Sequence, residues 1–339
     1  MWHAFVIYTD AMALANNSVA NCLICSGETR ERSPLDGPFR LIECCDCHFQ
    51  FVLPRPSLEE LEAVYNGPGE AIVPCTRSQC EEAGSRLHRL ISRFGASGTN
   101  VLEIGCNNGF NLGGLHSYGY SVTGTDLSAP GVDFARERIP EGKFYHTEFP
   151  SDTLIGTFDV LLAAHLIEHV IDPRAFVLRC ARFLKPGGLF IILTPNVYSI
   201  GMRLFSRHYP VYCPPVHLNY FSGQTLFKLL RVNFKIEYFE TNSAWTDPRN
   251  TLFSSIVSLT HIIGLKQKLR QSSAFQSAHT SEHNTDNDCI RKPWLMPLVR
   301  TSTQYAQAAM MPLFWVCNRM GFGENILLVA RKRATPDHA

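Results

Sequence analysis

The stretch Val101-Leu-Glu-Ile-Gly-Cys-Asn-Asn-Gly109, followed by Asp126, decides the fold of this chain. An apolar strand pattern ends in a loop that contains two glycines, and a helical pattern begins directly after the loop. Glycines let the backbone of such a loop approach a ligand, and an acid at the end of the next strand can accept hydrogen bonds from ribose hydroxyls. Asp126 lies 21 positions after Gly105, close to the spacing of about 20 typical of a ribose-binding acid. The pattern predicts a site for an adenosine-containing cofactor.

The spacing of the glycines argues against a dinucleotide. Sites for NAD(P) or FAD favour G-x-G-x-x-G, whose glycines support a pyrophosphate. This loop has Asn107 between its glycines and Glu103 two residues before the first of them. A carboxylate at that position would repel a pyrophosphate and suits a cationic ligand. Asparagine enters the left-handed backbone region more readily than most residues, so Asn107 can replace a glycine. A glycine turn in an unrelated α/β fold is the alternative interpretation.

At these residues the chain resembles the class I S-adenosylmethionine-dependent methyltransferases, whose first motif is an apolar pair, an acid and G-x-G-x-G. It is similar to the type 11/23 group and to quinone-biosynthesis O-methyltransferases, with matches over 100–240 that include Phe158-Asp-Val-Leu-Leu-Ala-Ala164 and Phe183-Leu-Lys-Pro-Gly-Gly-Leu-Phe190. The resemblance implies that Glu103 organises the methionine end of S-adenosylmethionine and that Asp126 binds the ribose. The cofactor-binding residues that it implies are Glu103, Gly105, Cys106, Asn107, Gly109, Asp126, Leu127, Glu148, Ala164 and His165. For Glu148, a solvated surface position is an equal alternative.

From residue 100 onward, short apolar runs alternate with helical patterns, which predicts a Rossmann-like α/β fold with a doubly wound parallel sheet. The expected strands are 101–104, 121–125, 143–146, 158–164, 189–193, 234–240 and 325–331, with helices from near Phe110, Ser128 and Asp172 and earlier helices at 57–65 and 79–94. Between the last two strands, 251–269 and 294–320 have apolar residues at helical spacing. A helical insertion is therefore expected before the last strand.

These patterns divide the chain into five predicted parts. They are a disordered or misassigned start at 1–20, a zinc ribbon at 21–56, linking helices at 57–97, a methyltransferase domain at 98–240 plus 325–335, and a helical insertion or substrate cap at 241–324.

Four cysteines near the start have the spacing of a metal site. Cys22-x-x-Cys25 and Cys44-x-x-Cys47 are separated by 18 residues, within the range that closes a tetrahedral Zn²⁺ site of four thiolates. Cys45 is the spare cysteine of this cluster, and a redox dithiol is the alternative. With Arg55-Pro-Ser-Leu-Glu-Glu-Leu61 after it, the module resembles the zinc-ribbon-bearing branch of the class I methyltransferases. That branch is associated with sugar, antibiotic and polysaccharide biosynthesis, which implies a small-molecule or glycan acceptor.

His165-Leu-Ile-Glu-His169 matches the zinc-peptidase pattern H-x-x-E-H. That interpretation requires both histidines on one face of a long helix, whereas this segment follows an apolar strand and stops at Asp172-Pro173. In the similar quinone-biosynthesis enzymes an E-x-x-E-H segment is associated with a divalent metal, and here His165 replaces the first glutamate. Glu168 and His169 are interpreted as a buried hydrogen-bonded pair, and His165 as a residue that faces the methionine end or the acceptor.

Asn196, His217 and Tyr220 are predicted to form the rim of the acceptor pocket. His217 resembles a histidine that recurs in this methyltransferase group, so His217 and His165 are the candidate catalytic residues. A histidine can remove a proton from a hydroxyl near neutral pH, but a local hydrogen-bonding role is the alternative for His217. Methyl transfer chiefly requires an in-line approach, so positioning of the acceptor can dominate over base catalysis.

Bulk composition narrows the classes of partner. The 31 basic and 30 acidic side chains nearly cancel, so no nucleic-acid partner is expected. The uneven placement of the twelve cysteines favours a reduced compartment, and we expect a cytoplasmic protein without a transmembrane segment. Apolar helical spacing at 294–320 leaves peripheral membrane contact open.

Two functions fit these patterns. The first is methyl transfer from S-adenosylmethionine to an oxygen or carbon of a small-molecule, sugar or lipid-linked acceptor. The second is a non-catalytic protein that binds S-adenosylmethionine and uses its zinc ribbon for protein contacts.

Overall fold

The computed structural model describes residues 21–35, 37–67, 76–147, 157–205, 209–242 and 316–334. The chain divides into two compact units, of which the first comprises Met1–Pro195, Cys213–Glu240 and Ile326–Ala339, and the second Asn196–Tyr212 and Thr241–Asn325. The predictions for 1–20, Glu148 and 251–269, and for most of 294–320, fall outside the described residues.

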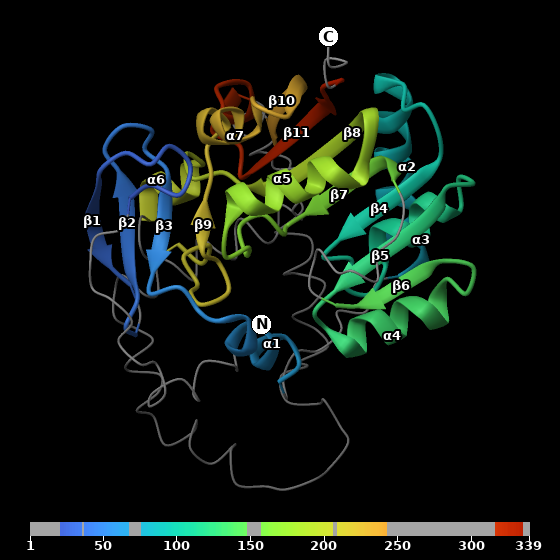
Figure 1. Ribbon diagram of the computed structural model, residues 1–339, viewed down its shortest axis with the longest axis horizontal. Helices are drawn as coiled ribbons and strands as arrows, with labels where there is room; N and C mark the ends of the chain where they lie inside the picture. The colour runs from blue at the N-terminus through green and yellow to red at the C-terminus, as the bar shows by residue number, and fades with distance from the viewer. Residues whose placement is uncertain are drawn as a thin grey trace, which may run out of the picture. The chain divides into compact units, whose positions relative to one another are not determined.

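A seven-stranded sheet forms the centre of the first unit, with the strand order β10-β11-β8-β7-β4-β5-β6 (Figure 1). Its strands are β4 (Asn100–Ile104), β5 (Ser121–Asp126), β6 (Lys143–His146), β7 (Phe158–Ala164), β8 (Leu184–Pro195), β10 (Phe234–Asn242) and β11 (Asn325–Lys332). The neighbours β5–β6, β4–β5, β4–β7 and β7–β8 are parallel. Lys332 at the end of β11 donates to the carbonyl of Leu184 at the start of β8, 2.6 Å away, so β11 runs against β8.

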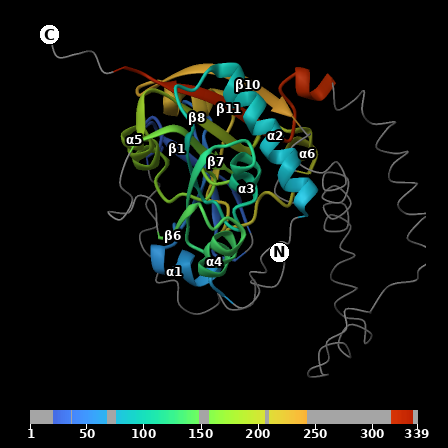
Figure 2. The same ribbon diagram turned by 90° about the vertical axis from the view of Figure 1, so that its right-hand side faces the viewer.

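Helices cover both faces of this sheet, with α2 and α3 on one side and α5 on the other (Figure 2). The helices are α1 (Leu58–Tyr65), α2 (Arg77–Phe94), α3 (Phe110–His116), α4 (Ala129–Arg138), α5 (Pro173–Phe183) and α7 (Gly223–Leu230), with α6 (Ile200–Phe205) in the second unit. Side chains of Ser57, Thr76, Ser128, Asp172 and Ser222 accept hydrogen bonds from the first-turn amides of five of these helices. These caps explain where the helices begin, because they satisfy amides that have no partner inside the helix.

A second, four-stranded sheet contains the cysteine module, in the order β1-β2-β3-β9. The strands are β1 (Thr29–Pro34), β2 (Arg40–Cys44), β3 (Gln50–Leu53) and β9 (Asn219–Tyr220). The first three come from the N-terminal module, whereas β9 comes from the chain directly before α7. One hydrophobic core joins this sheet to the face of the large sheet that carries α5 and α7, through Phe49, Phe51, Phe176, Phe190 and Leu226. The module is therefore an integral part of the first unit.

The expected α/β fold is confirmed, and three details differ from expectation. The sheet is mixed rather than parallel throughout, because β11 runs against β8. β8 begins at Leu184 rather than at Leu189, because Leu184 already pairs with Phe158 and the pairing resumes at Val160 after an irregularity. The strand β9 was not expected, because its two residues have no recognisable strand pattern of their own. No helix among the described residues is long and apolar enough to cross a membrane.

In the second unit, the structure describes α6 and a helical stretch at 316–319, at the end of the expected helix 294–320. Asn196 is buried there, and its amide donates to the carbonyls of Gly321 and Gly323 at 2.9 Å each. The buried Tyr209 hydroxyl donates to Glu324 at 2.8 Å.

Two adjacent glycines in α3 provide a test of the contact between α2 and α3. A Cβ on Gly114 would lie 2.2 Å from the carbonyl oxygen of Cys80 in α2, whereas a Cβ on Gly113 would make an ordinary contact, 3.5 Å from Ile139. Gly114→Ala should therefore lower the free energy of unfolding by about 2 kcal/mol or more through overpacking. Gly113→Ala should raise it by up to about 1 kcal/mol, because alanine favours the helix. Urea unfolding measures both changes, and equal destabilisation by the two variants would contradict the packing described.

Candidate active site

The loop after β4 forms a glycine cradle at the carboxyl edge of the sheet. Gly105, Asn107 and Gly109 all have positive φ angles, of 72°, 42° and 69°. The amides of Gly105 and Cys106 both donate to the carbonyl of Thr125 on β5, at 2.8 and 3.0 Å. The left-handed conformation expected of Asn107 is therefore present. A Cβ on Gly105 would lie 2.8 Å from a methyl of Leu166, so a larger residue would have to displace that side chain.

Asp126 ties this cradle to the start of the next loop. Its Oδ2 accepts from the amide of Asn107 at 2.7 Å, and its Oδ1 accepts from the amide of Ser128 at 2.8 Å. Burial raises the pKa of Asp126, although these two amide donors oppose the increase. Each carboxylate oxygen has a further lone pair, so the side chain can still accept hydrogen bonds from two neighbouring hydroxyls.

Glu103 is buried beneath the cradle with an unused oxygen. Its Oε1 accepts from the side-chain amide of Asn111 at 2.6 Å, and its Oε2 has no hydrogen-bond partner among the described residues. Burial raises the pKa of Glu103 to about 8, because only one amide stabilises the charged form. A buried acid with an open acceptor is costly unless a partner arrives. The buried carboxylate therefore fits a ligand that presents a positive charge.

The other residues predicted to bind the cofactor lie around this loop in different ways. The buried thiol of Cys106 packs under the cradle near Gly124. The carbonyl of Leu127 accepts from the side chain of Asn66 at 2.9 Å and lies 3.0 Å from Nε2 of His146. Ala164 is the half-buried last residue of β7. Glu148 lies outside the described residues.

The segment 165–170 after β7 forms a bend and turns rather than a helix. His165 has a positive φ of 53°, which is rare for a residue with a side chain and marks a constrained position. The helix that the peptidase interpretation requires is therefore absent from this segment. The imidazole of His165 is 43% exposed, whereas the Glu168 side chain is only 2% exposed.

Glu168 holds the centre of a cluster of polar side chains. One oxygen accepts from the Thr194 hydroxyl at 2.8 Å, and the other lies 3.4 Å from Nδ1 of His165 and 3.8 Å from Nε2 of His169. Burial by itself would raise the pKa of Glu168, but the nearby imidazole of His165 and the charges of His169 and His217 lower it to about 2. Glu168 is therefore ionised at neutral pH. The hydrogen bond expected between Glu168 and His169 is absent, because 3.8 Å is too long for one, and Nδ1 of His169 instead meets the hydroxyl of Tyr65.

Burial and the neighbouring His217 lower the pKa of His169 to about 4, against the opposing effect of Glu168. The Nδ1 atom of His169 lies 3.1 Å from the hydroxyl of Tyr65 at the end of α1. The rings of His169 and His217 meet edge to face, with centroids 4.8 Å apart. The structure thus brings His165 and His217, the two predicted catalytic residues, into one group around Glu168 and His169.

The predicted rim residues belong to different units. The buried Tyr220 uses its hydroxyl to donate to the carbonyl of His217 at 3.0 Å, so its polar atom stabilises the local turn. Asn196 belongs to the second unit, where its amide is used by the two glycine carbonyls described above.

One group in this region has side chains that could hold a cation. The potential ligand atoms of Glu168, His169 and His217 all lie within 4.8 Å of one another. A set of one carboxylate and two imidazoles suits a first-row transition metal better than Mg²⁺, which prefers oxygen ligands.

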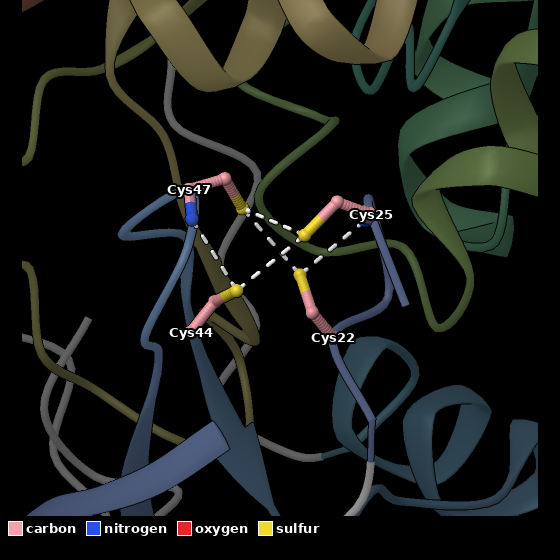
Figure 3. A group of neighbouring side chains, drawn as sticks. All are labelled: Cys22, Cys25, Cys44 and Cys47. Atoms are coloured by element: carbon pink, nitrogen blue, oxygen red, sulfur yellow. Dashed lines mark hydrogen bonds between the residues drawn. The ribbon is translucent and has the colours of Figure 1, made fainter. Parts of the chain in front are cut away.

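The four thiols of Cys22, Cys25, Cys44 and Cys47 point toward a common centre (Figure 3). Their Sγ atoms are separated by 3.6 Å for Cys22–Cys47, 3.5 Å for Cys25–Cys44 and 3.4 Å for Cys25–Cys47. These distances are far longer than the roughly 2 Å of a disulfide and close to the ~3.8 Å edge of a tetrahedron with Zn–S bonds of about 2.3 Å. The amides of Cys25 and Cys47 donate to Cys22 and Cys44, at 3.5 and 3.4 Å. Cys45 is exposed and stands apart from the group.

Sequence reasoning did not identify the contribution of α1 to the site. Asn66 donates to the carbonyl of Leu127 and accepts from the amide of Ala129 at 3.0 Å, so it contacts the loop that follows Asp126. Tyr65 contacts His169 on the other side of the same helix end. Tyr65 and Asn66 lie at the end of a helix whose sequence pattern predicts only the helix itself, and not a contact with the site.

Part of the chain is similar in sequence to proteins of a known family. Residues 78–237 match the family described as a methyltransferase domain. Ubiquinone biosynthesis O-methyltransferases from Thiobacillus denitrificans and Pseudomonas aeruginosa are 35% and 32% identical over 132 and 117 residues, which cover 37% and 33% of this chain. These matches cover 57% and 50% of the two relatives, so the chain spans about half the length of the curated relatives that it matches.

Solved structures with a similar fold include a SAM-dependent methyltransferase from Archaeoglobus fulgidus, at 18% identity and a TM-score of 0.42. The match covers 82% of this chain and 100% of that one. A putative sarcosine dimethylglycine methyltransferase from Galdieria sulphuraria is 13% identical, with a TM-score of 0.45, and the match covers 74% and 86% of the two chains. Together, the family match, the sheet order and the cradle identify residues 78–237 as a class I S-adenosylmethionine-dependent methyltransferase domain.

Proposed function

We propose that this protein transfers the methyl group of S-adenosylmethionine to a hydroxyl oxygen of a small-molecule acceptor, with a structural zinc ion in its four-cysteine module. The observation that carries the proposal is the cradle at the end of β4, where Glu103 keeps an open acceptor beneath a glycine loop that Asp126 closes. The names of the curated relatives support oxygen as the methylated atom. Sugars and lipid-linked molecules are within the same acceptor class.

The residues of the cradle divide the recognition of the cofactor between them. Asp126 accepts hydrogen bonds from the ribose hydroxyls, while Glu103 offers its free Oε2 to the positive charge at the methionine end. When bound, S-adenosylmethionine supplies an electrophilic methyl group on a cationic sulfur. The bond between methyl carbon and sulfur breaks with its electron pair going to sulfur, while the acceptor oxygen forms the new bond to carbon.

His165 removes the acceptor proton in this proposal. Glu168 is ionised and its oxygen lies 3.4 Å from Nδ1 of His165, so it can hold the proton on that nitrogen. Nε2 is then the free base, on a ring that is 43% exposed. His169 is a poorer base because its pKa is about 4. Its role is to pack between Tyr65 and His217.

The raised pKa of Glu103 makes cofactor affinity depend on pH. The group is largely protonated below about pH 8 in the free protein, and binding of a cation favours the carboxylate. The affinity for S-adenosylmethionine should therefore rise with pH between 6 and 7.5. The rise should be at most tenfold per pH unit, which corresponds to about 1.4 kcal/mol of binding free energy. Calorimetry in buffers of different ionisation enthalpy should detect release of a proton on binding.

Glu103→Gln is the control for this effect. The variant should lose the rise in affinity, while Asp133→Asn on the exposed face of α4 should retain it. The ligand's own α-amino group titrates near pH 8, so the comparison is kept below pH 7.5. In the free protein, the raised pKa also means that stability from this group is present below about pH 4.5 and is lost as pH rises through about 8. No binding of S-adenosylmethionine by the wild type would overturn the proposed function.

Substitution of His165 tests the acceptor side separately from the cofactor side. A panel of hydroxylated phenols and sugars is first screened for transfer of a labelled methyl group. With a positive acceptor, His165→Gln should lower kcat by about 10²-fold or more and remove the dependence of the rate on a basic group, with little change in cofactor affinity. His116→Gln, at the exposed end of α3, is the matched control. An unchanged pH profile in His165→Gln would rule out this base.

The four-cysteine module predicts different effects for two adjacent cysteines. Cys44 is buried and belongs to the cluster of four cysteines, whereas Cys45 is exposed and lies outside that cluster. Cys44→Ser should abolish stoichiometric zinc, as measured by elemental analysis, and lower the free energy of unfolding by on the order of 4 kcal/mol. Cys45→Ser should keep the zinc and change stability by less than about 0.5 kcal/mol. Equal zinc loss in the two variants would indicate a different set of ligands.

A further inference from the structure

Residues 217–221, which we call the bridging segment, lie between the cysteine module and the loop 165–170. On the module side, β9 pairs with β3 through Gln50↔Tyr220 and Phe51↔Asn219. The amide of Val52 donates to the carbonyl of Leu218 at 3.0 Å. The Phe49 and Phe221 rings contact each other, with centroids 5.2 Å apart. The bridging segment is therefore an edge of the module's own sheet, although it is distant in sequence.

Arg55 reinforces this attachment directly after β3. Its Nη1 donates to the carbonyl of Leu218 at 2.9 Å, and its Nη2 donates to Oδ1 of Asn219 at 2.6 Å. The guanidinium lies 5.8 Å from the centre of the Phe51 ring. Such a planar fork presents its donors to two acceptors in a fixed geometry, which the flexible ammonium of a lysine does not. Arg55 thus binds both the main chain and a side chain of the bridging segment.

On the opposite side, the bridging segment is bound to the loop that carries Glu168 and His169. The amides of Leu218 and Asn219 both donate to the carbonyl of Glu168, at 2.8 and 2.9 Å. The side-chain amide of the buried Asn219 donates to the carbonyls of Val170 at 2.7 Å and Ile167 at 3.3 Å. One asparagine side chain therefore accepts from the module and donates to the loop.

The adenosyl cradle has hydrogen bonds of its own, although Leu166 of the loop 165–170 packs against Gly105. Gly105 and Cys106 bond to Thr125, and Asp126 bonds to the amides of Asn107 and Ser128. All of these contacts join β4 and β5 and their loops. None of them involves the bridging segment or Arg55.

From these contacts we propose that Arg55 and Asn219 are positioning residues, which transmit the metal-loaded fold of the cysteine module to the loop 165–170 and leave the hydrogen bonds of the adenosyl cradle intact. A structural metal that is bound by four thiolates contributes directly to the folding free energy of a small module. Loss of the metal would loosen β3, then the bridging segment and finally the loop that carries His165. The inference rests on the proposed function for the meaning of that loop, but its structural content is tested without turnover.

Hydrogen–deuterium exchange on the full chain, followed by mass spectrometry, measures this coupling. Removal of zinc with a chelator should raise the exchange rates of 165–170 and 217–220 by about tenfold or more, the effect of losing a net hydrogen bond. The rates of 101–126 should stay within about twofold of the loaded protein. Unchanged exchange at 165–170 after confirmed zinc loss would overturn the proposal, as would an equal rise at 101–126.

Two substitutions, both studied at full zinc occupancy, test the two sets of contacts of the bridging segment separately. One set joins it to the cysteine module and the other to the loop 165–170. Asn219→Asp keeps the acceptor for Arg55 but removes the amide that donates to Val170, so it should raise exchange at 165–170 while β3 stays protected. Arg55→Lys removes the bidentate contact and should raise exchange in both 217–220 and 165–170. Arg40→Lys is the matched control, because Arg40 is on the same module and pairs with Glu31 at its surface. Exchange at 165–170 that matches this control in both variants would contradict the inference.

A spectroscopic readout distinguishes positioning from a general loss of stability. The ring signals of His165, His169 and His217, assigned by NMR in histidine-labelled protein, should shift in Asn219→Asp but not in Arg40→Lys. The affinity for S-adenosylmethionine should stay within about twofold of the wild type in both variants, since the cradle has hydrogen bonds of its own. Failure of the wild type to bind S-adenosylmethionine would defeat the proposed function, whereas unchanged ring signals would defeat this inference.

Discussion

The loop after β7 and the segments around it depend on the contacts of one buried carboxylate, that of Glu168. Burying a carboxylate is costly unless charged or hydrogen-bonding partners replace water. Here one oxygen takes the Thr194 hydroxyl of β8, and the other lies between the rings of His165 and His169. The main-chain oxygen of the same residue accepts two amides from the segment 217–221. One residue therefore fixes the end of β8, the loop after β7 and the strand that enters the module's sheet.

This arrangement explains why the cysteine module is not an appendage. Its strand β3 takes β9 as a neighbour, and its aromatic side chains join the core under α5 and α7. Phe49 and Phe51 are fully buried, so separation of the module would expose large apolar surfaces on both sides. Hydrophobic burial holds the module against the sheet, and hydrogen bonds set its register. The two kinds of contact together place the chain from 217 onward.

Much of the fold and of the cofactor side could be predicted from sequence because the signals are local. A β-strand that is covered on both faces is apolar throughout, as in β7, and a helix start is indicated by its cap, as at Ser128 and Asp172. The positive φ of Asn107 follows from the conformational freedom of asparagine at the middle position of the loop. The clustering of the four cysteines follows from their spacing.

The remaining features depend on contacts between distant segments. Nothing in the letters around Asn219 indicates that its amide meets Val170 while its oxygen meets Arg55. The sharp bend at His165 is also set by its surroundings, since a positive φ such as its 53° is uncommon for any residue other than glycine. The sequence pattern H-x-x-E-H shows which residues are near one another, but not that both histidines turn toward the glutamate between them. The domain boundaries and the roles of the individual site residues stay predictions.

Two buried acids at the carboxyl ends of neighbouring strands show how the two halves of the site differ. Glu103 at β4 has one amide donor and an unused oxygen, and burial raises its pKa to about 8. Glu168 after β7 has a hydroxyl and nearby imidazoles, which lower its pKa to about 2 despite burial. Environments that separate two similar groups in this way give them different chemical roles. The first acid gains most from a cation brought by a ligand, whereas the second is already balanced by its own histidines and can orient one of them.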